Sequence, residues 1–104
     1  MSVDRGITAW RSFIAPLHGQ SFTLTSPVTT SAPNGMDWMK AFYSQCPDCL
    51  SSTDILALHW YDVHESDLEA YIENWYSTFQ KPIVVSEFAC QVRILPFEII
   101  CWGR

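Results

Sequence analysis

The sequence predicts an α/β fold built on a parallel sheet, and three observations support this fold class. Helical stripes and strand-like segments alternate in the order helix, strand, helix, strand, helix, strand. The strand-like segments start near Phe22, Ile55 and Ile83, so they repeat about every 30 residues, the size of one strand–helix unit. The segments near Ile55 and Ile83 are apolar, without alternation of apolar and polar residues, as expected of strands covered on both faces. Three parallel strands cannot close a barrel and leave two unpaired edges, so we expect part of a larger fold.

The first two elements are a helix over 2–17 and a short strand over 21–25. Ser2 is a plausible N-cap, and apolar residues follow it at helical steps of four and three: Val3, Ile7, Trp10, Ile14 and Leu17. The chain breaks at 16–19, which contains a proline and a glycine. The next residues, 21–25, read as a strand that runs into Ser26-Pro27.

A second helix and a buried strand follow. The helix opens at Asn34-Gly35 and stops at Cys46-Pro47, with a one-sided stripe: Met39, Phe42, Tyr43 and Cys46. The run 54–61 is apolar without polar alternation, which is typical of a central strand of a parallel sheet.

The third helix and third strand are the clearest elements of the pattern. Residues 66–69 have the spacing of a capping box, and the stripe that follows contains Leu68, Ile72, Trp75 and Phe79. Lys81-Pro82 ends this helix, and residues 82–88 form a strand. Pro82 is its first residue, a position where the missing N–H costs no hydrogen bond between strands. Residues 92–104 match no period, and we expect either a strand or a disordered tail there.

Composition restricts the classes of partner. With 104 residues the chain forms one small domain, and six basic against eleven acidic side chains give a net charge of −5. Six scattered basic residues form no stripe that would neutralise phosphates, so we expect no nucleic acid partner. The longest apolar runs are about four residues, so we expect no membrane partner. Residues 1–5 lack the pattern of a secretory signal. Fifteen aromatic residues serve either as core or as flat platforms for ligands.

Candidate functional residues lie where the predicted strands end, because the carboxyl ends of parallel strands form the functional edge of α/β folds. Ser26, Glu87 and the run His59-Trp60-Tyr61 occupy these ends. Alternation points His59 and Tyr61 to one face and Trp60 to the other. A carboxylate that ends a hydrophobic strand indicates either a function or an ion pair with a neighbouring His or Arg. A glutamate combined with aromatic rings favours a sugar site.

The motif Cys46-Pro47-Asp48-Cys49 permits a redox reading, which we keep as an alternative. Reactive thiols of this kind sit at helix N-termini, whereas here the pattern predicts that the motif follows a helix and precedes a strand. With Cys90 and Cys101 the chain has four cysteines, which allow three disulfide pairings or two thiol pairs. No HExxH, second CxxC, phosphate loop or dinucleotide motif occurs, so we predict neither a metal nor a cofactor.

Four blocks taken in order resemble the fungal alkali-sensitive-linkage-like proteins of glycoside hydrolase family 128. The blocks are residues 24–29, 46–49, 54–61 and 81–90, and the resemblance runs from about Met1 to Cys90. It implies a partial (β/α)₈ TIM barrel of about three βα units, family strands 5 to 7. It also implies retaining hydrolysis of β-1,3-glucan in fungal cell walls by two glutamates, in proteins that are secreted or bound to the cell wall.

The resemblance assigns roles to individual residues. Glu87, in Ser86-Glu87-Phe88-Ala89, corresponds to the nucleophile, and the block that contains His59, Trp60 and Tyr61 lines the sugar cleft, with Ser26 at the end of the neighbouring strand.

The chain also departs from the family pattern. The family's acid/base glutamate lies in an Asn-Glu-Pro block, which does not occur here, so the chain resembles a stretch that begins just after it. Asp62 is the candidate near the rim, but it lies where the family does not place the acid. We therefore expect a fragment that is inactive alone; the alternatives are a non-catalytic carbohydrate-binding remnant and a CxxC redox protein.

Two segments follow from these matches: a partial catalytic domain over 1–91 and an atypical tail over 92–104. Val92-Arg93 can be encoded by GTACGT, which suits a fungal 5′ splice site. Our hypothesis is that the tail is a translated intron.

Overall fold

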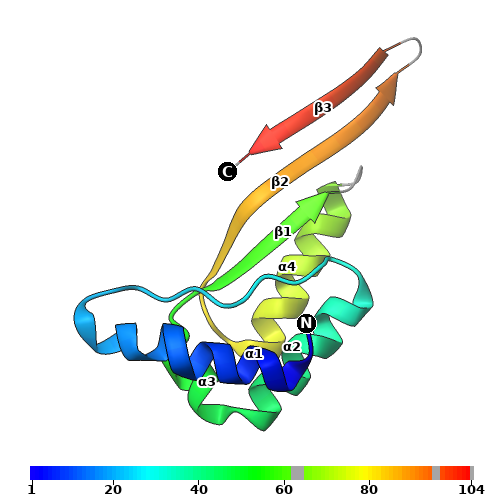
Figure 1. Ribbon diagram of the computed structural model, residues 1–104. Coiled ribbons are helices and arrows are strands. Elements are labelled where there is room, and N and C mark those ends of the chain that lie inside the picture. The colour runs from blue at the N-terminus through cyan, green and yellow to red at the C-terminus, as the bar shows by residue number, and fades with distance from the viewer. Residues whose placement is uncertain (62–64, 95–96, 104) are drawn as a thin grey trace.

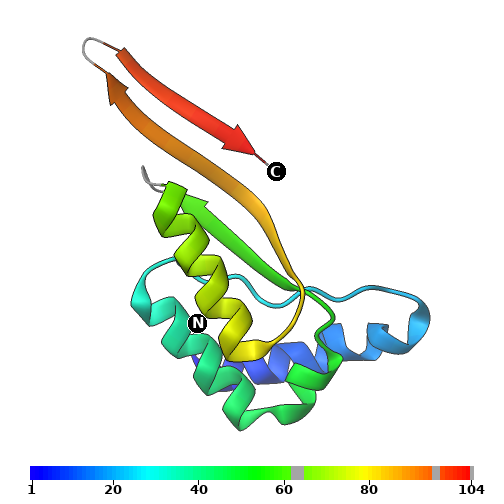
Figure 2. The same ribbon diagram turned by 180° about the vertical axis from the view of Figure 1, so that it is seen from behind.

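A group of helices packs at one end of a small mixed sheet in the computed structural model, which describes residues 1–61, 65–94 and 97–103, with side chains for 1–60 and 67–87. The order of elements is α1 (Val3–Ala9), η1 (Trp10–Ile14), η2 (Ala15–Gln20), α2 (Pro33–Gln45), α3 (Pro47–Ser52), β1 (Leu56–Tyr61), α4 (Glu65–Phe79), β2 (Ile83–Ile94) and β3 (Phe97–Gly103). Figures 1 and 2 show β2 and β3 extending beyond the helices. None of the described helices is long and apolar enough to cross a membrane.

The sheet has the strand order β1-β2-β3. β1 and β2 are parallel, and α4 is the crossover between them, as the alternation of elements predicts. β3 pairs antiparallel to β2, with seven residue pairs from Phe88–Gly103 to Ile94–Phe97. The prediction of three parallel strands is therefore confirmed for two of them, and part of the 92–104 segment forms a strand that runs the opposite way.

The strand predicted over 21–25 is reduced to a single parallel bridge between Thr25 and Ile55, which corrects the sequence prediction. On both sides of this bridge, side-chain oxygens accept the backbone N–H groups that would otherwise bond to the neighbouring strand. The Leu24 N–H donates to Asp54 Oδ2 at 2.8 Å, and the Ala57 N–H donates to Ser26 Oγ at 2.9 Å. The segment lies beside β1, but the backbone pattern that defines a strand ends there.

The N-terminal helix changes type along its length, where the sequence predicted one regular helix. Ser2 is the N-cap, as predicted, and its Oγ accepts the Arg5 N–H at 3.2 Å. After α1 the chain forms a π-helical turn and then a 3₁₀ segment that ends at Ser21, which has φ 68°. Pro16 explains the change, because its ring clashes with the carbonyl four residues earlier and it donates no helical bond.

A chain of aromatic contacts forms the centre of the core. Successive ring pairs lie 5.0–6.2 Å apart, edge-on or tilted, and lead from η1 through α2 and α4 to β1. The rings are, in order, Trp10, Phe42, Tyr43, Phe79, Trp75, Tyr71 and Trp60. The predicted stripes of the second and third helices supply most of them. Aromatic packing therefore joins the helices to the sheet.

Tyr43 carries a buried hydroxyl in this core. Its Oη lies 2.9 Å from Thr53 Oγ1, and Thr53 Oγ1 donates to the Cys49 carbonyl oxygen at 2.9 Å. Burial raises the pKa of Tyr43 to about 12, although the bond to Thr53 acts in the opposite direction. The folded protein therefore holds this proton more tightly than the unfolded chain does.

Stability is expected to fall as the pH rises from about 10 to about 12, because the unfolded tyrosine ionises first in that window. The stabilisation is fully present below pH 10. Melting temperatures measured by circular dichroism at pH 9 and pH 11.5 test this. The Tyr43→Phe variant removes this titration and should lose less stability over the same interval; an equal loss in both proteins would contradict the assignment.

Candidate functional site

A carboxylate and an imidazole meet where β1 and β2 lie side by side. His59 Nε2 lies 3.0 Å from Glu87 Oε2, and the two side chains are 34% and 55% exposed. They come from parallel strands, so residues 28 positions apart in the chain face each other directly. The site therefore holds a solvent-accessible carboxylate whose orientation is fixed by a neighbouring ring.

An irregularity in the β1–β2 ladder makes this pairing possible. Leu58 pairs with Val85, but His59 pairs with Glu87, so Ser86 is an extra residue in β2. Side chains alternate along a strand, and one extra residue reverses the alternation beyond it. Without the bulge, Glu87 would lie on the opposite face, the face of Trp60. The bulge therefore brings Glu87 to the His59 side.

Trp60 faces the helices. Its side chain is 8% exposed, and its ring lies 5.0 Å from that of Tyr71 in α4 at an interplanar angle of 33°. It supports the strand from the face opposite to that of His59. Tyr61 pairs with Ala89 in the ladder, and its side chain lies outside the described residues, as do Asp62 and His64.

Ser26 is almost fully buried, with 4% of its surface exposed. Its backbone N–H donates to the Ile55 carbonyl oxygen at 2.9 Å, and its hydroxyl oxygen accepts the Ala57 N–H. Ser26 therefore ties the 24–26 segment to β1 two residues before His59. The residues after it, 28–31, line a cavity of about 380 Å³ together with His59. Sequence reasoning assigned no role to Thr30 and Ser31, because only the folded chain shows that they lie beside His59.

A more apolar cavity of about 550 Å³ lies between the N-terminal helices and residues 22–27. Its walls include Trp10, Ile14 and Phe22, and it contains neither His59 nor Glu87. His59 therefore lies at the smaller, more polar cavity, and Glu87 lies next to that cavity through its contact with His59.

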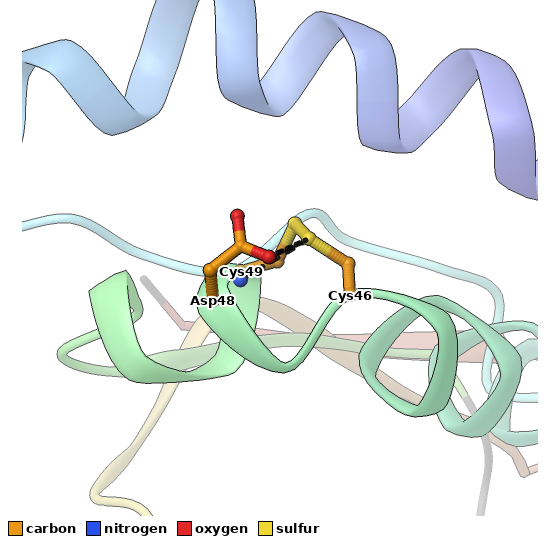
Figure 3. A group of neighbouring side chains, drawn as sticks. All are labelled: Cys46, Asp48 and Cys49. Atoms are coloured by element: carbon orange, nitrogen blue, oxygen red, sulfur yellow. Dashed lines mark hydrogen bonds between the residues drawn. A yellow bond between two sulfur atoms is a disulfide. The ribbon is translucent and has the colours of Figure 1, made fainter.

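The structure corrects the sequence prediction about the CxxC motif. Cys46 is the N-cap residue of α3, and its Sγ accepts the Cys49 N–H at 3.2 Å, so the motif does lie at a helix start and not directly before a strand. Figure 3 shows Cys46 and Cys49 joined by a disulfide, with Asp48 Oδ1 3.3 Å from Cys46 Sγ. Cys90 and Cys101 are partners in the β2–β3 register, and their side chains lie outside the described residues.

The disulfide has the surroundings of a structural link. Both cysteines are 0% exposed, and Arg11 forms a two-pronged contact with Asp48 at 3.0 and 2.7 Å. Hydrogen bonding to Arg11 lowers the pKa of Asp48. The three side chains also form a cluster of potential metal ligands, but a metal would need thiolates, and both sulfurs are bonded to each other.

Reduction of the native disulfide is expected to be slow, because a reducing nucleophile must reach a sulfur atom that is fully covered. The protein would be treated with a phosphine reductant, alkylated and mapped by peptide mass spectrometry. Modification of Cys46 and Cys49 should appear in urea and be largely absent without it. Rapid modification of both residues in buffer would contradict the structural role and favour the redox alternative.

Comparison with known proteins gives this geometry its context. Residues 1–97 match the model of the family described as "Glycosyl hydrolase catalytic core". Over 80 residues the chain is 38% identical to alkali-sensitive linkage protein 1 of Schizosaccharomyces pombe, a match that covers 75% of this chain and 14% of that protein.

Two solved structures are also similar. One is a GH128 subgroup VI exo-β-1,3-glucanase from Aureobasidium namibiae, with 27% identity, a TM-score of 0.79 and coverage of 92% of this chain and 39% of the other. The second is a GH128 subgroup VII oligosaccharide-binding protein from Cryptococcus neoformans, with 35% identity, a TM-score of 0.75 and coverage of 86% and 35%. The chain thus spans well under half the length of each relative. It belongs to the glycosyl hydrolase catalytic core family, and the predicted resemblance to the alkali-sensitive-linkage-like proteins of glycoside hydrolase family 128 is confirmed.

Proposed function

We propose that this chain is the part of a retaining β-1,3-glucan hydrolase that carries the nucleophile, Glu87. The observation that supports this most is the exposed Glu87 carboxylate held 3.0 Å from His59 where two parallel strands lie side by side. Active sites of (β/α)₈ barrels lie at the carboxyl ends of the strands. The substrate class follows from the relative described as an exo-β-1,3-glucanase.

In this proposal the chain is a partial (β/α)₈ TIM barrel that corresponds to about three units, family strands 5 to 7. The parallel pair β1 and β2 with α4 between them is one complete unit. The bridge between Thr25 and Ile55 marks the position of the preceding strand. His59 would contact the sugar from the face that Glu87 shares, and strand alternation in the sequence assigns Tyr61 the same role. Ser26 and Trp60 would support the cleft, Ser26 from the neighbouring segment and Trp60 from the helix side.

The proposed chemistry has two parts, of which this chain supplies one. The Glu87 carboxylate attacks the anomeric carbon, and the bond to the leaving oxygen breaks to give a glycosyl ester. His59 donates from Nε2 to Glu87 Oε2 and keeps the other carboxylate oxygen directed at the substrate. A second carboxyl group about 5–5.5 Å away must protonate the leaving oxygen. No Asn-Glu-Pro occurs in the sequence, so the chain alone is not expected to hydrolyse laminarin.

The nucleophile can be tested without the missing acid. A β-laminaribiosyl fluoride needs little protonation of its leaving group, so Glu87 should displace fluoride and form an ester. Because no second carboxylate activates water, this ester should accumulate. Intact mass spectrometry is expected to show one added disaccharide, located on Glu87 by peptide mapping. The Glu87→Gln variant should remain unlabelled, whereas Asp67→Asn, an exposed carboxylate in α4, should label normally.

Two outcomes would contradict the proposal. Labelling that persists in Glu87→Gln would place the nucleophile elsewhere. A wild-type chain that stays unlabelled but binds laminaripentaose would favour the second candidate, a carbohydrate-binding protein without catalysis. That candidate is supported by the 35% identity to the relative described as an oligosaccharide-binding protein.

The tail and the location are part of the same proposal. We infer a partial catalytic domain over 1–91 and an atypical tail over 92–104 that derives from a translated intron, in a protein family that acts outside the cell or in its wall. The antiparallel direction of β3 differs from the parallel order of β1 and β2, which supports a distinct origin for the tail. A transcript that reads directly through Val92 to Arg104 would overturn the intron hypothesis.

A further inference from the structure

We propose that the loop Val28–Ser31 and His59 form a sugar subsite next to Glu87, which binds one pyranose unit of the glucan through the hydroxyl groups of Thr30 and Ser31. This inference rests on the proposed function and deepens it by assigning substrate-contacting residues. The three observations that carry it are the cavity of about 380 Å³ between this loop and His59, the exposed hydroxyl side chains in its wall, and the contact of His59 with Glu87.

The cavity exists because the chain leaves the sheet after Ser26. A further ladder bond would require the Ala57 N–H, but the Ser26 hydroxyl oxygen already accepts it at 2.9 Å. Residues 28–31 therefore run past the second half of β1 without pairing to it. The gap between this loop and His59 lies where two neighbouring segments diverge, which is a typical location of ligand sites in α/β folds.

The wall of the cavity suits a pyranose ring. Val28, Thr30 and Ser31 are exposed, so one apolar group stands beside two hydroxyl groups. A sugar ring presents the same mixture, with C–H groups on its faces and hydroxyl groups at its edge. Thr30 Oγ1 donates to Asn34 Oδ1 at 3.2 Å, which leaves its lone pairs to accept from a ligand. Ser31 makes no hydrogen bond within the described residues.

His59 places the subsite directly beside the reaction centre. Its side chain forms one wall of the cavity and contacts Glu87 through Nε2. A sugar unit in the cavity would therefore be separated from the Glu87 carboxylate by a single side chain. Such a unit is a direct neighbour of the unit that Glu87 attacks, and its binding would help to place the scissile bond.

The loop is held in position by close packing on the start of α2. A Cβ atom at Gly35 would collide with the backbone carbonyl oxygen of Thr30 and would lie 2.8 Å from Thr29 Oγ1. The backbone of the loop thus passes directly over a glycine. A fixed loop loses little conformational entropy when a ligand binds, which favours a binding role.

The test titrates the full chain with laminaripentaose and measures Kd by isothermal titration calorimetry. Ser31→Ala and Thr30→Val are each expected to weaken binding about fivefold, the effect of one lost hydrogen bond. Ser44→Ala, an exposed serine of α2 outside the cavity, should bind like the wild type. Gly35→Ala should also weaken binding, because it displaces the loop without altering a cavity hydroxyl. Far-UV circular dichroism checks that each variant is folded.

The outcomes separate the subsite from the proposed function. If the wild type binds and Ser31→Ala, Thr30→Val and Gly35→Ala all keep the wild-type Kd, the subsite is wrong while the proposed function stands. If the wild type neither binds the pentasaccharide nor forms the ester on Glu87, the proposed function itself fails, and the subsite fails with it. Weaker binding in the three variants together with normal binding in Ser44→Ala supports the subsite.

Discussion

Replacing Trp75 with alanine is expected to destabilise the protein by about 3–5 kcal/mol, the usual cost of removing a large ring from a closed core. Trp75 is 1% exposed and contacts the rings of Tyr71 and Phe79 at 5.9 and 5.4 Å. It lies in the middle of the aromatic chain that joins α2 to β1. Small domains have only about 5–15 kcal/mol of stability, so a large part of the variant should be unfolded in buffer.

Urea denaturation followed by circular dichroism at 222 nm measures this effect. The matched control is Tyr76→Ala on the same helix, because Tyr76 is 58% exposed and the next residue in the chain. Its cost should be within about 0.5 kcal/mol. Equal destabilisation by the two substitutions would mean that the aromatic chain does not form the core.

Insertion of one alanine between Ser86 and Glu87 is expected to abolish ester formation at Glu87 and to weaken binding of laminaripentaose. With the bulge unchanged, the inserted residue would pair with His59, and the glutamate would turn to the face of Trp60. The carboxylate would then lose its contact with His59 and enter the helix-facing side. Calorimetric titration and the laminaribiosyl fluoride assay measure the two losses, and far-UV circular dichroism verifies that the sheet remains.

Ser86→Ala is the control for the insertion, since it keeps the number of residues in β2 and removes only the hydroxyl group. That hydroxyl lies 3.5 Å from the Leu58 carbonyl oxygen, which is a weak contact. Binding and labelling should therefore stay close to the wild-type values. If Ser86→Ala and the insertion lower binding and labelling equally, the activity of Glu87 does not depend on the register of β2 against β1.

The elements that sequence predicts well are those governed by side-chain period. The stripe of α4 and the apolar runs of β1 and β2 follow directly from residue spacing, since helical and strand periods differ. The predicted end of α4 is less accurate. The helix ends at Phe79, because Gln80 has φ 54°, whereas the sequence predicts the end at Lys81-Pro82. A left-handed residue other than glycine leaves no clear signal in the sequence.

The features that sequence missed depend on single contacts between distant segments or on an element too short to show a period. The strand over 21–25 has suitable residues, but Ser26 and Asp54 take the backbone donors that a ladder would use. The start of α3 at Pro47 was missed because six residues are too few to show a period. The sequence offered two explanations for Glu87, a function or an ion pair with a histidine. The structure shows the pair with His59, and the proposed chemistry makes use of it.

The antiparallel β3 strand has a consequence for how copies of this chain associate. Seven residue pairs occupy the outer edge of β2, so no further chain can add there unless β3 leaves. In the described part of the chain, the opposite side of the sheet is the edge of β1, where the ladder stops at the Thr25–Ile55 bridge. On the other side β3 is now the edge strand, so the described sheet ends in two unlike borders, β1 and β3, each with unpaired backbone groups. A contact between the β1 border of one copy and the β3 border of the next leaves one border open at each end, so association by this route does not stop at a dimer.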